Sequence, residues 1–256
     1  MVGRADPAEC WKLPTAAAKI RWCNGVPGGE DDVQRDFVPL EPQYCSWREV
    51  YHWGPERGME LGGDADTVHF VKYAMGSTKI REHWHPQHES SYYASFIAFV
   101  RDGLACAPQP ARLAGFFWLQ GESDTSSAKL ASAYHDDLVA LVQAVRRDLA
   151  CPELPFVASH VVWPRGKKVG AVNEALTRAC AGSGALGPYA ACVPSDGYST
   201  NPAQAHHMDT ASVLLAGQRM SEAYRDLVSG HAINMAGSTG GVQAAAYREC
   251  CSGPER

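Results

Sequence analysis

Residues 113–149 read LAGFFWLQGESDTSSAKLASAYHDDLVALVQAVRRDL, and two periodicities in this stretch decide the fold. Residues 113–121 form a nearly continuous apolar run, which is typical of a strand buried on both faces of a sheet. From 126 to 149 the apolar residues recur at steps of three or four, which predicts an amphipathic helix behind the N-cap candidates Asp124 and Ser126. The stretch therefore predicts one buried strand and the helix that covers it.

The same alternation occurs along most of the chain. Further strands are predicted at 67–76, 154–164 and 190–194, and further helices at 89–102, 168–180 and 210–228. Apolar strands that alternate with amphipathic helices indicate an α/β fold, a three-layer α/β/α sandwich around a parallel sheet. The chemistry of such sheets gathers at the carboxyl ends of the strands. We expect one domain over 1–228 and a poorly ordered tail over 229–256, which is rich in Gly, Ala and Ser.

Composition excludes several classes of protein. Hydrophobic residues make up 45% and charged residues 20%, as in an ordinary globular chain. No stretch approaches the ~20 consecutive apolar residues of a membrane span. The net charge of -5, without a basic stripe, argues against nucleic acid, so neither a membrane nor a nucleic acid is an expected partner. The nine cysteines include no CxxC pair, which argues against a zinc ribbon, and no signal sequence is visible, which leaves the localisation open.

Two segments that follow predicted strands carry side chains suited to catalysis. QGESD, residues 120–124, places an amide and two carboxylates on a turn between a strand and a helix. Helix capping by Asp124, with Glu122 favoured by the helix dipole, explains these carboxylates equally well. AHHMDT, residues 205–210, places two histidines directly before a helix. A His beside a carboxylate at strand ends forms the base and orienting acid of a hydrolytic triad, although a lone His is more often structural.

Four short blocks of the sequence, taken in chain order, match the pattern of a known family. They are WGPE at 53–56, GSTKIREHW at 76–84, WLQGESD with its following helix at 118–149, and HMDTASVLLAGQRMSEAY at 207–224. Together they resemble the SGNH/GDSL-type hydrolases of the sialate O-acetylesterase-like group, which includes the acetylxylan esterases of carbohydrate esterase family six. The resemblance covers roughly 1–228 and implies a flavodoxin-like fold. It further implies that the chain removes acetyl esters from sugars or other small esters without a metal or organic cofactor.

The resemblance assigns the acid and the base. His207 matches the general base, whereas His206 lacks the family's offset to the Gly and Arg of the following helix. Glu122 matches the acid that orients the imidazole in some members. Other members use an Asp three residues before the His, where this chain has Gln204, and Asp196 is then the alternative acid.

The resemblance also assigns groups that would contact the substrate. Gly76 matches the backbone donor to the oxyanion, and Gln120 lies where a side-chain amide could assist it. Trp84, Tyr198 and Trp163 are either stacking platforms for a sugar or ordinary buried aromatic residues.

The nucleophile of the family is a serine in a Gly-Gln-Ser-Asn-Met turn after the first strand, and this turn does not occur in the 256 residues. Ser77 and Ser123 lie in other blocks, and Ser95 and Ser132 lie in predicted helices, so we expect none of them on a strand-to-helix elbow. Met1 matches the last residue of the missing turn, so the first strand and the serine are expected to precede it. A central neighbour strand should then be unpaired, and the chain less stable than one with that strand restored.

Two other functions stay open at this point. A descendant without a nucleophile would bind an acetylated sugar without hydrolysing it, and an upstream reading frame encoding Gly-Gln-Ser-Asn would argue against that alternative. His83, His85 and His88, with Glu89, offer imidazole ligands for a metal-dependent hydrolase, although Pro86 interrupts their spacing. Metal analysis of the purified protein tests this last function.

Overall fold

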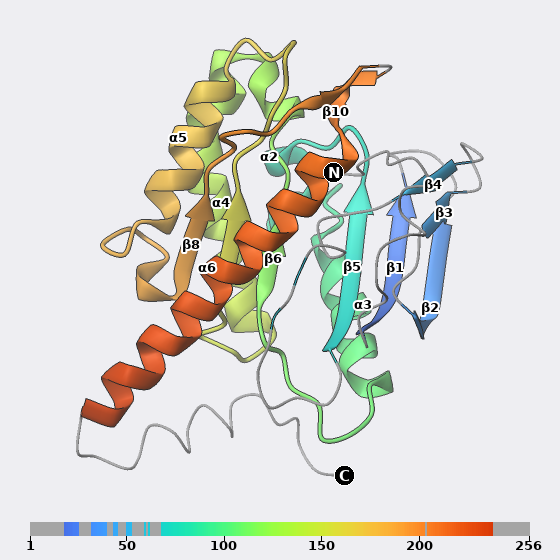
Figure 1. Ribbon diagram of the computed structural model, residues 1–256, viewed down its shortest axis with the longest axis vertical. Helices are drawn as coiled ribbons and strands as arrows, with labels where there is room; N and C mark the ends of the chain where they lie inside the picture. The colour runs from blue at the N-terminus through green and yellow to red at the C-terminus, as the bar shows by residue number, and fades with distance from the viewer. Residues whose placement is uncertain are drawn as a thin grey trace.

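The computed structural model describes residues 18–25, 32–39, 43–45, 50–52, 59, 61, 68–202 and 204–237, and these residues form an α/β fold. Two three-stranded sheets make up its centre (Figure 1). The first sheet has the order β2-β1-β5 and consists of β2 (Asp32–Pro39), β1 (Ala18–Gly25) and β5 (Val68–Met75). The second has the order β6-β7-β8 and consists of β6 (Phe116–Trp118), β7 (Phe156–Ser159) and β8 (Ala190–Val193).

The pairing within the two central sheets is mainly parallel, as the sequence predicts. In the second sheet Phe116 pairs with Phe156, and Phe156 pairs in turn with Ala190, both in parallel register. In the first sheet β1 runs parallel to β5 over eight residue pairs, from Ala18 opposite Val68 to Gly25 opposite Met75, whereas β2 is antiparallel to β1. Two small antiparallel pairs complete the described strands: β3 (Gln43–Cys45) with β4 (Val50–His52), and β9 (Thr200–Asn201) with β10 (Gln204–Met208).

Each of the two sheets ends on a strand that has only one partner. β5 pairs with β1 alone and β6 pairs with β7 alone within the described chain, and the two strands are not hydrogen bonded to each other. Side chains bridge the two sheets instead, because Phe96 packs against both Tyr73 of β5 and Phe116 of β6. That a strand preceding Met1 would pair beside one of these strands stays a prediction.

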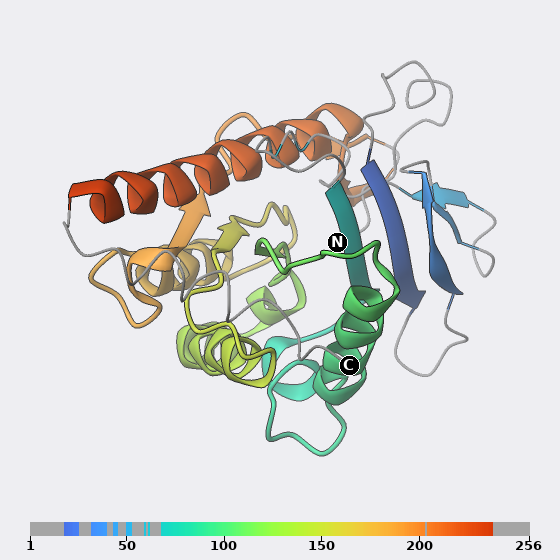
Figure 2. The ribbon, with the colours of Figure 1, turned by 90° about the horizontal axis from the view of Figure 1, so that it is seen from below.

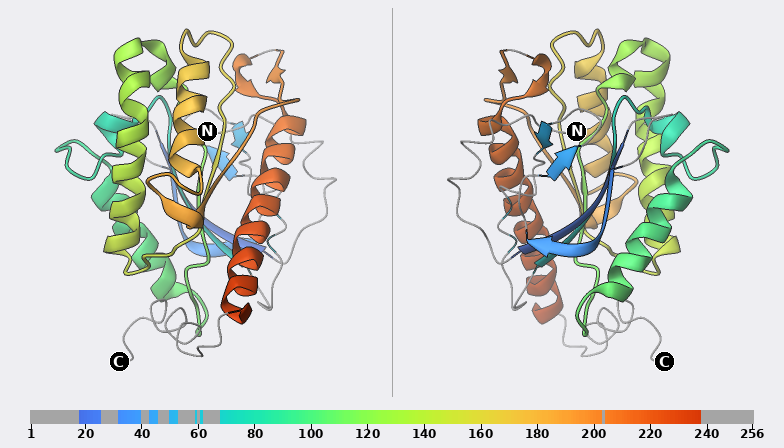
Figure 3. Two further views of the ribbon diagram at one scale, coloured as in Figure 1. Left: turned by 90° about the vertical axis from the view of Figure 1, so that its left-hand side faces the viewer. Right: turned by 90° about the vertical axis from the view of Figure 1, so that its right-hand side faces the viewer.

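Helices cover both faces of the sheets, which confirms the three-layer prediction. The helices are α2 (Ile80–His83), α3 (Tyr93–Cys106), α4 (Ala128–Asp148), α5 (Val169–Cys180) and α6 (Thr210–Gly237). Figures 2 and 3 show α6 on one side of the strands and α3 and α4 on the other. Along β7 the side chains alternate accordingly: Phe156 and Ala158 pack in the core under α3, α4 and α5, and Val157 packs against α6.

Several elements differ from the predictions. β1 and β2 lie before residue 67, where no strand was predicted. Ser127 is the N-cap of α4, because its side chain accepts a hydrogen bond from the Leu130 backbone N–H at 3.3 Å, so neither Asp124 nor Ser126 has that role. Residues 229–237 continue α6, so this part of the expected tail is helical, and 238–256 lie outside the described residues. No described helix is both long and apolar enough to span a bilayer.

Candidate active site

The residues predicted to form the site follow strands or precede a helix at one end of the fold. Gly76 follows β5, Glu122 follows β6, Asp196 follows β8, and His207 lies in β10 three residues before α6. Figure 1 shows β10 and the first turn of α6 at the end of the molecule where β5 and β8 finish. The carboxyl edge is where parallel sheets place their chemistry, so the topology brings the predicted residues to the expected place.

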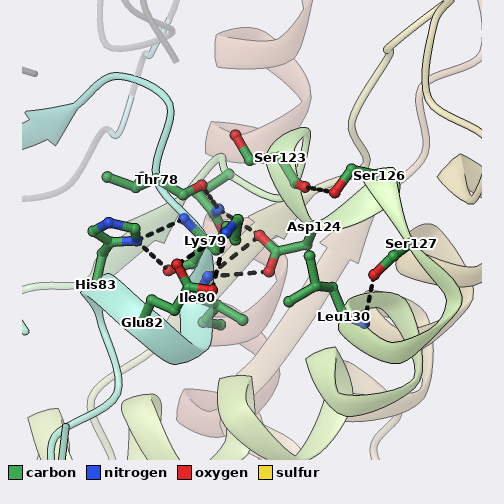
Figure 4. Close-up of polar contacts among 11 residues, drawn as sticks. Thr78, Lys79, Ile80, Glu82, His83, Ser123, Asp124, Ser126, Ser127 and Leu130 are labelled. Carbon is green, nitrogen blue, oxygen red and sulfur yellow. Dashed lines mark hydrogen bonds and ion pairs between the residues drawn. The ribbon is translucent and has the colours of Figure 1, made fainter. Parts of the chain in front are cut away.

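Hydrogen bonds fasten the turn after β5 to the turn after β6 (Figure 4). The Gln120 side-chain amide donates to the Thr78 carbonyl oxygen and to the Asp124 carboxylate, both at 2.8 Å. The Ile80 backbone N–H donates to Asp124 at 3.1 Å. Since β5 and β6 are not paired as strands, these side-chain bonds fix the position of Gly76 relative to Glu122.

Two buried aromatic side chains, Tyr134 and Trp118, fix the position of Gln120 by a chain of hydrogen bonds. The Tyr134 hydroxyl lies 2.7 Å from the Gln120 carbonyl oxygen and 3.1 Å from its Oε1, and the Trp118 indole N–H donates to the same hydroxyl. The two amide hydrogens of Gln120 are directed to Thr78 and Asp124. Gln120 therefore holds the two turns together, and its contact with an oxyanion stays a prediction.

Asp124 is a residue of the site that the sequence analysis assigned to helix capping. Its side chain is fully buried and accepts hydrogen bonds from Gln120 and Ile80. Burial raises the pKa of Asp124 to about 7, because the cost of desolvating the carboxylate exceeds the benefit of those hydrogen bonds. A carboxylate that titrates near neutral pH thus lies beside the two turns that carry the predicted oxyanion donor and acid.

The Glu122 side chain is poorly satisfied for a carboxylate. Its Oε1 atom is buried and has no hydrogen-bond partner among the residues that the structure describes. Burial raises the pKa of Glu122 above its usual range. Buried polar atoms are normally paired, so an unpaired carboxylate oxygen at a strand end is a signal of function.

His207 lies on β10 with both ring nitrogens buried. The next residue, Met208, is fully buried, and Leu119 packs against the cluster that Met208 forms with Val213 and Ala216 of α6. Because Leu119 immediately precedes Gln120, this packing places the His207 strand beside the turn after β6. The side chains of His206 and Gln204 lie outside what the structure describes.

Arg219 of α6 fixes the segment between β8 and β9. Its guanidinium donates to the backbone oxygens of Pro194 at 3.1 Å and Asp196 at 2.7 Å, and it lies over the Tyr198 ring, 5.2 Å from the ring centroid. The Asp196 side chain itself is exposed. The contact with Arg219 therefore involves the Asp196 backbone and not its carboxylate. The role of Asp196 as the alternative acid stays a prediction.

Ser77 lies on a strand-to-helix turn, which the sequence analysis did not expect of any serine. It follows β5, precedes α2, is exposed, and has φ of 59°. This left-handed conformation is rare for a residue with a side chain and costs about 1 kcal/mol or more. Neighbouring bonds hold the turn in place: the Thr78 hydroxyl donates to the Met75 oxygen, and the Trp84 indole N–H donates to the Thr78 hydroxyl at 3.0 Å.

Replacing Ser77 by glycine is therefore expected to stabilise the fold. Ser77→Gly should raise the free energy of unfolding by about 1 kcal/mol, because glycine adopts a positive φ without strain. Denaturant unfolding measures this change. Ser132→Gly, at an exposed position inside α4, is the matched control and should lower the same free energy by about 0.5 kcal/mol. Destabilisation by Ser77→Gly would contradict the assignment of strain.

The histidines proposed as metal ligands have other contacts. His83 Nδ1 accepts a hydrogen bond from the Lys79 backbone N–H at 3.1 Å, and its ring stacks on Tyr92. Among the described residues, which include 83–89, no group of three or more His, Cys, Asp or Glu side chains could hold a metal ion. The metal-dependent alternative does not fit this geometry.

The aromatic residues proposed as stacking platforms divide into two kinds. Trp84 is 4% exposed and packs edge-on against Trp118, with ring centroids 5.5 Å apart, so it is a core residue. Tyr198 and Trp163 are partly exposed and stay candidates for contact with a sugar. The WGPE block at 53–56 lies outside the described residues.

Comparisons with known proteins bear on these observations. A family model described as "carbohydrate esterase, sialic acid-specific acetylesterase" matches residues 57–226. A solved protein from Arabidopsis thaliana has a TM-score of 0.62 at 19% identity, over 86% of this chain and 84% of that one. A carbohydrate acetylesterase from Xanthomonas citri has a TM-score of 0.52 at 14% identity, over 88% of this chain but 52% of its own length. Both structures share the fold, and no curated protein sequence matches the chain.

Proposed function

Because the chain belongs to the family of sialic acid-specific acetylesterases among the carbohydrate esterases, we propose that it hydrolyses O-acetyl esters of sugars by serine acyl transfer. The observation that carries this proposal is the Glu122 carboxyl group. It lies at the carboxyl end of a parallel strand with a buried oxygen that no described donor satisfies. A protonated imidazole is the partner that such a carboxylate would stabilise.

The proposed reaction has two half-reactions. His207 removes the proton of the serine hydroxyl, which attacks the acetyl carbonyl, and Glu122 stabilises the resulting imidazolium. The backbone N–H of Gly76 donates to the oxyanion of the tetrahedral intermediate. His207 then gives its proton to the leaving sugar oxygen. In the second half-reaction His207 takes a proton from a water molecule, which attacks the acetyl-serine. Acetate leaves, and the serine hydroxyl recovers its proton from His207.

The serine of this scheme is the residue that the family supplies from a Gly-Gln-Ser-Asn-Met turn, which the 256 residues do not contain. This observation favours a second candidate function, a protein that binds acetylated sugars without hydrolysing them. Ser77 is a described serine whose exposure and strand-to-helix position suit a nucleophile, so Ser77→Ala belongs in the test.

The test measures hydrolysis and binding on the same protein. An aryl acetate and an O-acetylated sialic acid are offered as substrates, and the binding of the acetylated sugar is followed by calorimetry. Hydrolysis that disappears in His207→Ala supports the esterase, and its loss in Ser77→Ala as well would locate the nucleophile. Saturable binding of the acetylated sugar without hydrolysis supports the binding function. Neither hydrolysis nor binding would overturn both functions for this chain.

Glu122→Gln separates the role of the acid in activity from its effect on stability. Hydrolysis should fall by about 100-fold, because a neutral amide cannot stabilise the imidazolium. The free energy of unfolding should rise by about 1 kcal/mol, because a neutral amide costs less to bury than a carboxylate with one unpaired oxygen. Kinetics on the aryl acetate and denaturant unfolding measure the two effects.

Glu174→Gln, on the exposed face of α5, is the matched control and should change neither quantity appreciably. Full activity in Glu122→Gln would instead favour Asp196 as the orienting acid.

A further inference from the structure

A second group of reactive side chains lies away from the proposed active site, between α5 and β8. Cys180 is the last residue of α5, and Cys192 is the third residue of β8. His160 follows β7 directly, and Thr177 lies one helical turn before Cys180. The three elements pack together, so the two thiols, the imidazole and the hydroxyl meet at one place.

Hydrogen bonds join this group. The Cys180 and Cys192 side chains are hydrogen bonded to each other. Cys192 also forms side-chain hydrogen bonds with His160 and Thr177, and His160 Nε2 lies 2.8 Å from the Thr177 hydroxyl. Cys192 thus has three polar neighbours, one of them an imidazole that can favour its thiolate.

The two thiols differ in accessibility and in acidity. Cys180 is 6% exposed, whereas Cys192 is partly exposed. The hydrogen bonds from Cys180 and His160 lower the pKa of the Cys192 thiol to about 6, and the bond to Cys192 together with burial raises the pKa of Cys180. Reactive cysteines combine access with an environment that favours the thiolate, and Cys192 meets both conditions.

We propose that Cys192 and Cys180 form a redox-active dithiol that a hydroperoxide converts to a disulfide. The Cys192 thiolate attacks the peroxide O–O bond, so that a sulfenic acid forms on Cys192 and hydroxide leaves. The Cys180 sulfur then attacks the Cys192 sulfur, the S–S bond forms, and the sulfenic oxygen leaves as water. In total two thiols lose two hydrogen atoms, one hydrogen peroxide is reduced, and two water molecules are produced.

The disulfide would constrain the part of the fold that leads to His207. It would join the end of α5 to β8, the strand that precedes Asp196 and the β9–β10 pair. A cross-link between neighbouring elements stabilises the native state by restricting the unfolded chain. We expect the midpoint of thermal unfolding to rise by about 5 °C or more on oxidation.

Peptide mapping of the oxidised protein tests the proposal without any reference to esterase activity. No Lys or Arg lies between Arg178 and Arg219, so trypsin leaves Cys180 and Cys192 in one peptide, 179–219, that contains no other cysteine. After treatment with hydrogen peroxide and removal of the excess, this peptide should be lighter by two hydrogen atoms and should resist alkylation. Reduction with dithiothreitol should restore both thiols.

Three variants sharpen the result. In Cys180→Ser the sulfenic acid on Cys192 should persist and react with dimedone, whereas Cys106→Ser, at an exposed cysteine, should leave disulfide formation unchanged. In the native protein at pH 6.5, iodoacetamide should alkylate Cys192 about tenfold faster than Cys106, and His160→Ala should remove that advantage. Alkylation of Cys192 no faster than that of Cys106, or a peptide 179–219 whose mass does not change with peroxide, would overturn the proposal.

Discussion

His207→Ala is expected to lower the hydrolysis of an acetyl ester by about 10⁴-fold or more, because the serine hydroxyl of the proposed reaction would then have no base to accept its proton. The loss should appear in kcat rather than in KM, since the role proposed for the imidazole is proton transfer in the transition state and not binding of the ester. Kinetics on an aryl acetate measure both constants, and circular dichroism checks that the variant is folded.

His206→Ala is the matched control for this prediction. His206 and His207 are neighbours in β10, and only His207 stands at the offset from Gly217 and Arg219 that the family's catalytic histidine has. His206 has no role in the proposed reaction, so His206→Ala should change kcat by less than about threefold. Equal losses in the two variants would show that the reaction depends on the structure of the β9–β10 pair and not on the imidazole of His207.

The fold could be predicted wherever local periodicity agrees with tertiary environment. The helix predicted over 126–149 is α4 (Ala128–Asp148), because its apolar stripe faces the sheets and its opposite face is polar. β1 was missed because a charged residue interrupts its apolar pattern. Arg21 is fully buried in β1, where it pairs with Asp102 and lies over the Phe99 ring at 4.4 Å. Only tertiary structure reveals that such an arginine belongs inside.

The sequence blocks predict only the positions of the candidate residues relative to the strands and helices. Gly76, Glu122 and His207 all lie at strand ends or beside a helix start, as the blocks imply. Asp124 was assigned to capping because an Asp before a helix fits that local role. One of its two donors, the Ile80 backbone N–H, is 44 residues away in sequence, so no local pattern could identify that contact. The unusual feature of Ser77 is its positive φ, which only the structure reveals.

Asp124 makes the stability of the protein depend on pH between about 4 and about 7. Its pKa is about 7 in the folded chain and 3.8 in a solvated one. Folding therefore favours the protonated form, and the stabilisation is fully present below pH 4 and is lost as the pH rises through 7. The difference between the two pKa values corresponds to about 4 kcal/mol, because one pH unit is worth about 1.4 kcal/mol.

Denaturant unfolding at pH 4.5 and at pH 8 of the native chain and of Asp124→Asn isolates this contribution. The asparagine cannot ionise, so the variant should lose most of the decrease in stability that Asp124 causes between the two pH values. Glu122 is also buried, its raised pKa gives a dependence of the same sign, and it is present in both proteins. Asp226→Asn removes an exposed carboxylate from α6 and should retain the native dependence.

Equal pH dependence in the native chain and in Asp124→Asn would show that Asp124 titrates in the fold much as it does in water. A smaller dependence in Asp124→Asn has a consequence for function. The proposed base His207 must be neutral to accept a proton. Above about pH 7 Asp124 is ionised, its destabilising effect is largest, and its bonds to Gln120 and Ile80 are strongest. The buried charge of Asp124 would then lower the stability of the chain in the same pH range in which its hydrogen bonds fix the two turns most strongly.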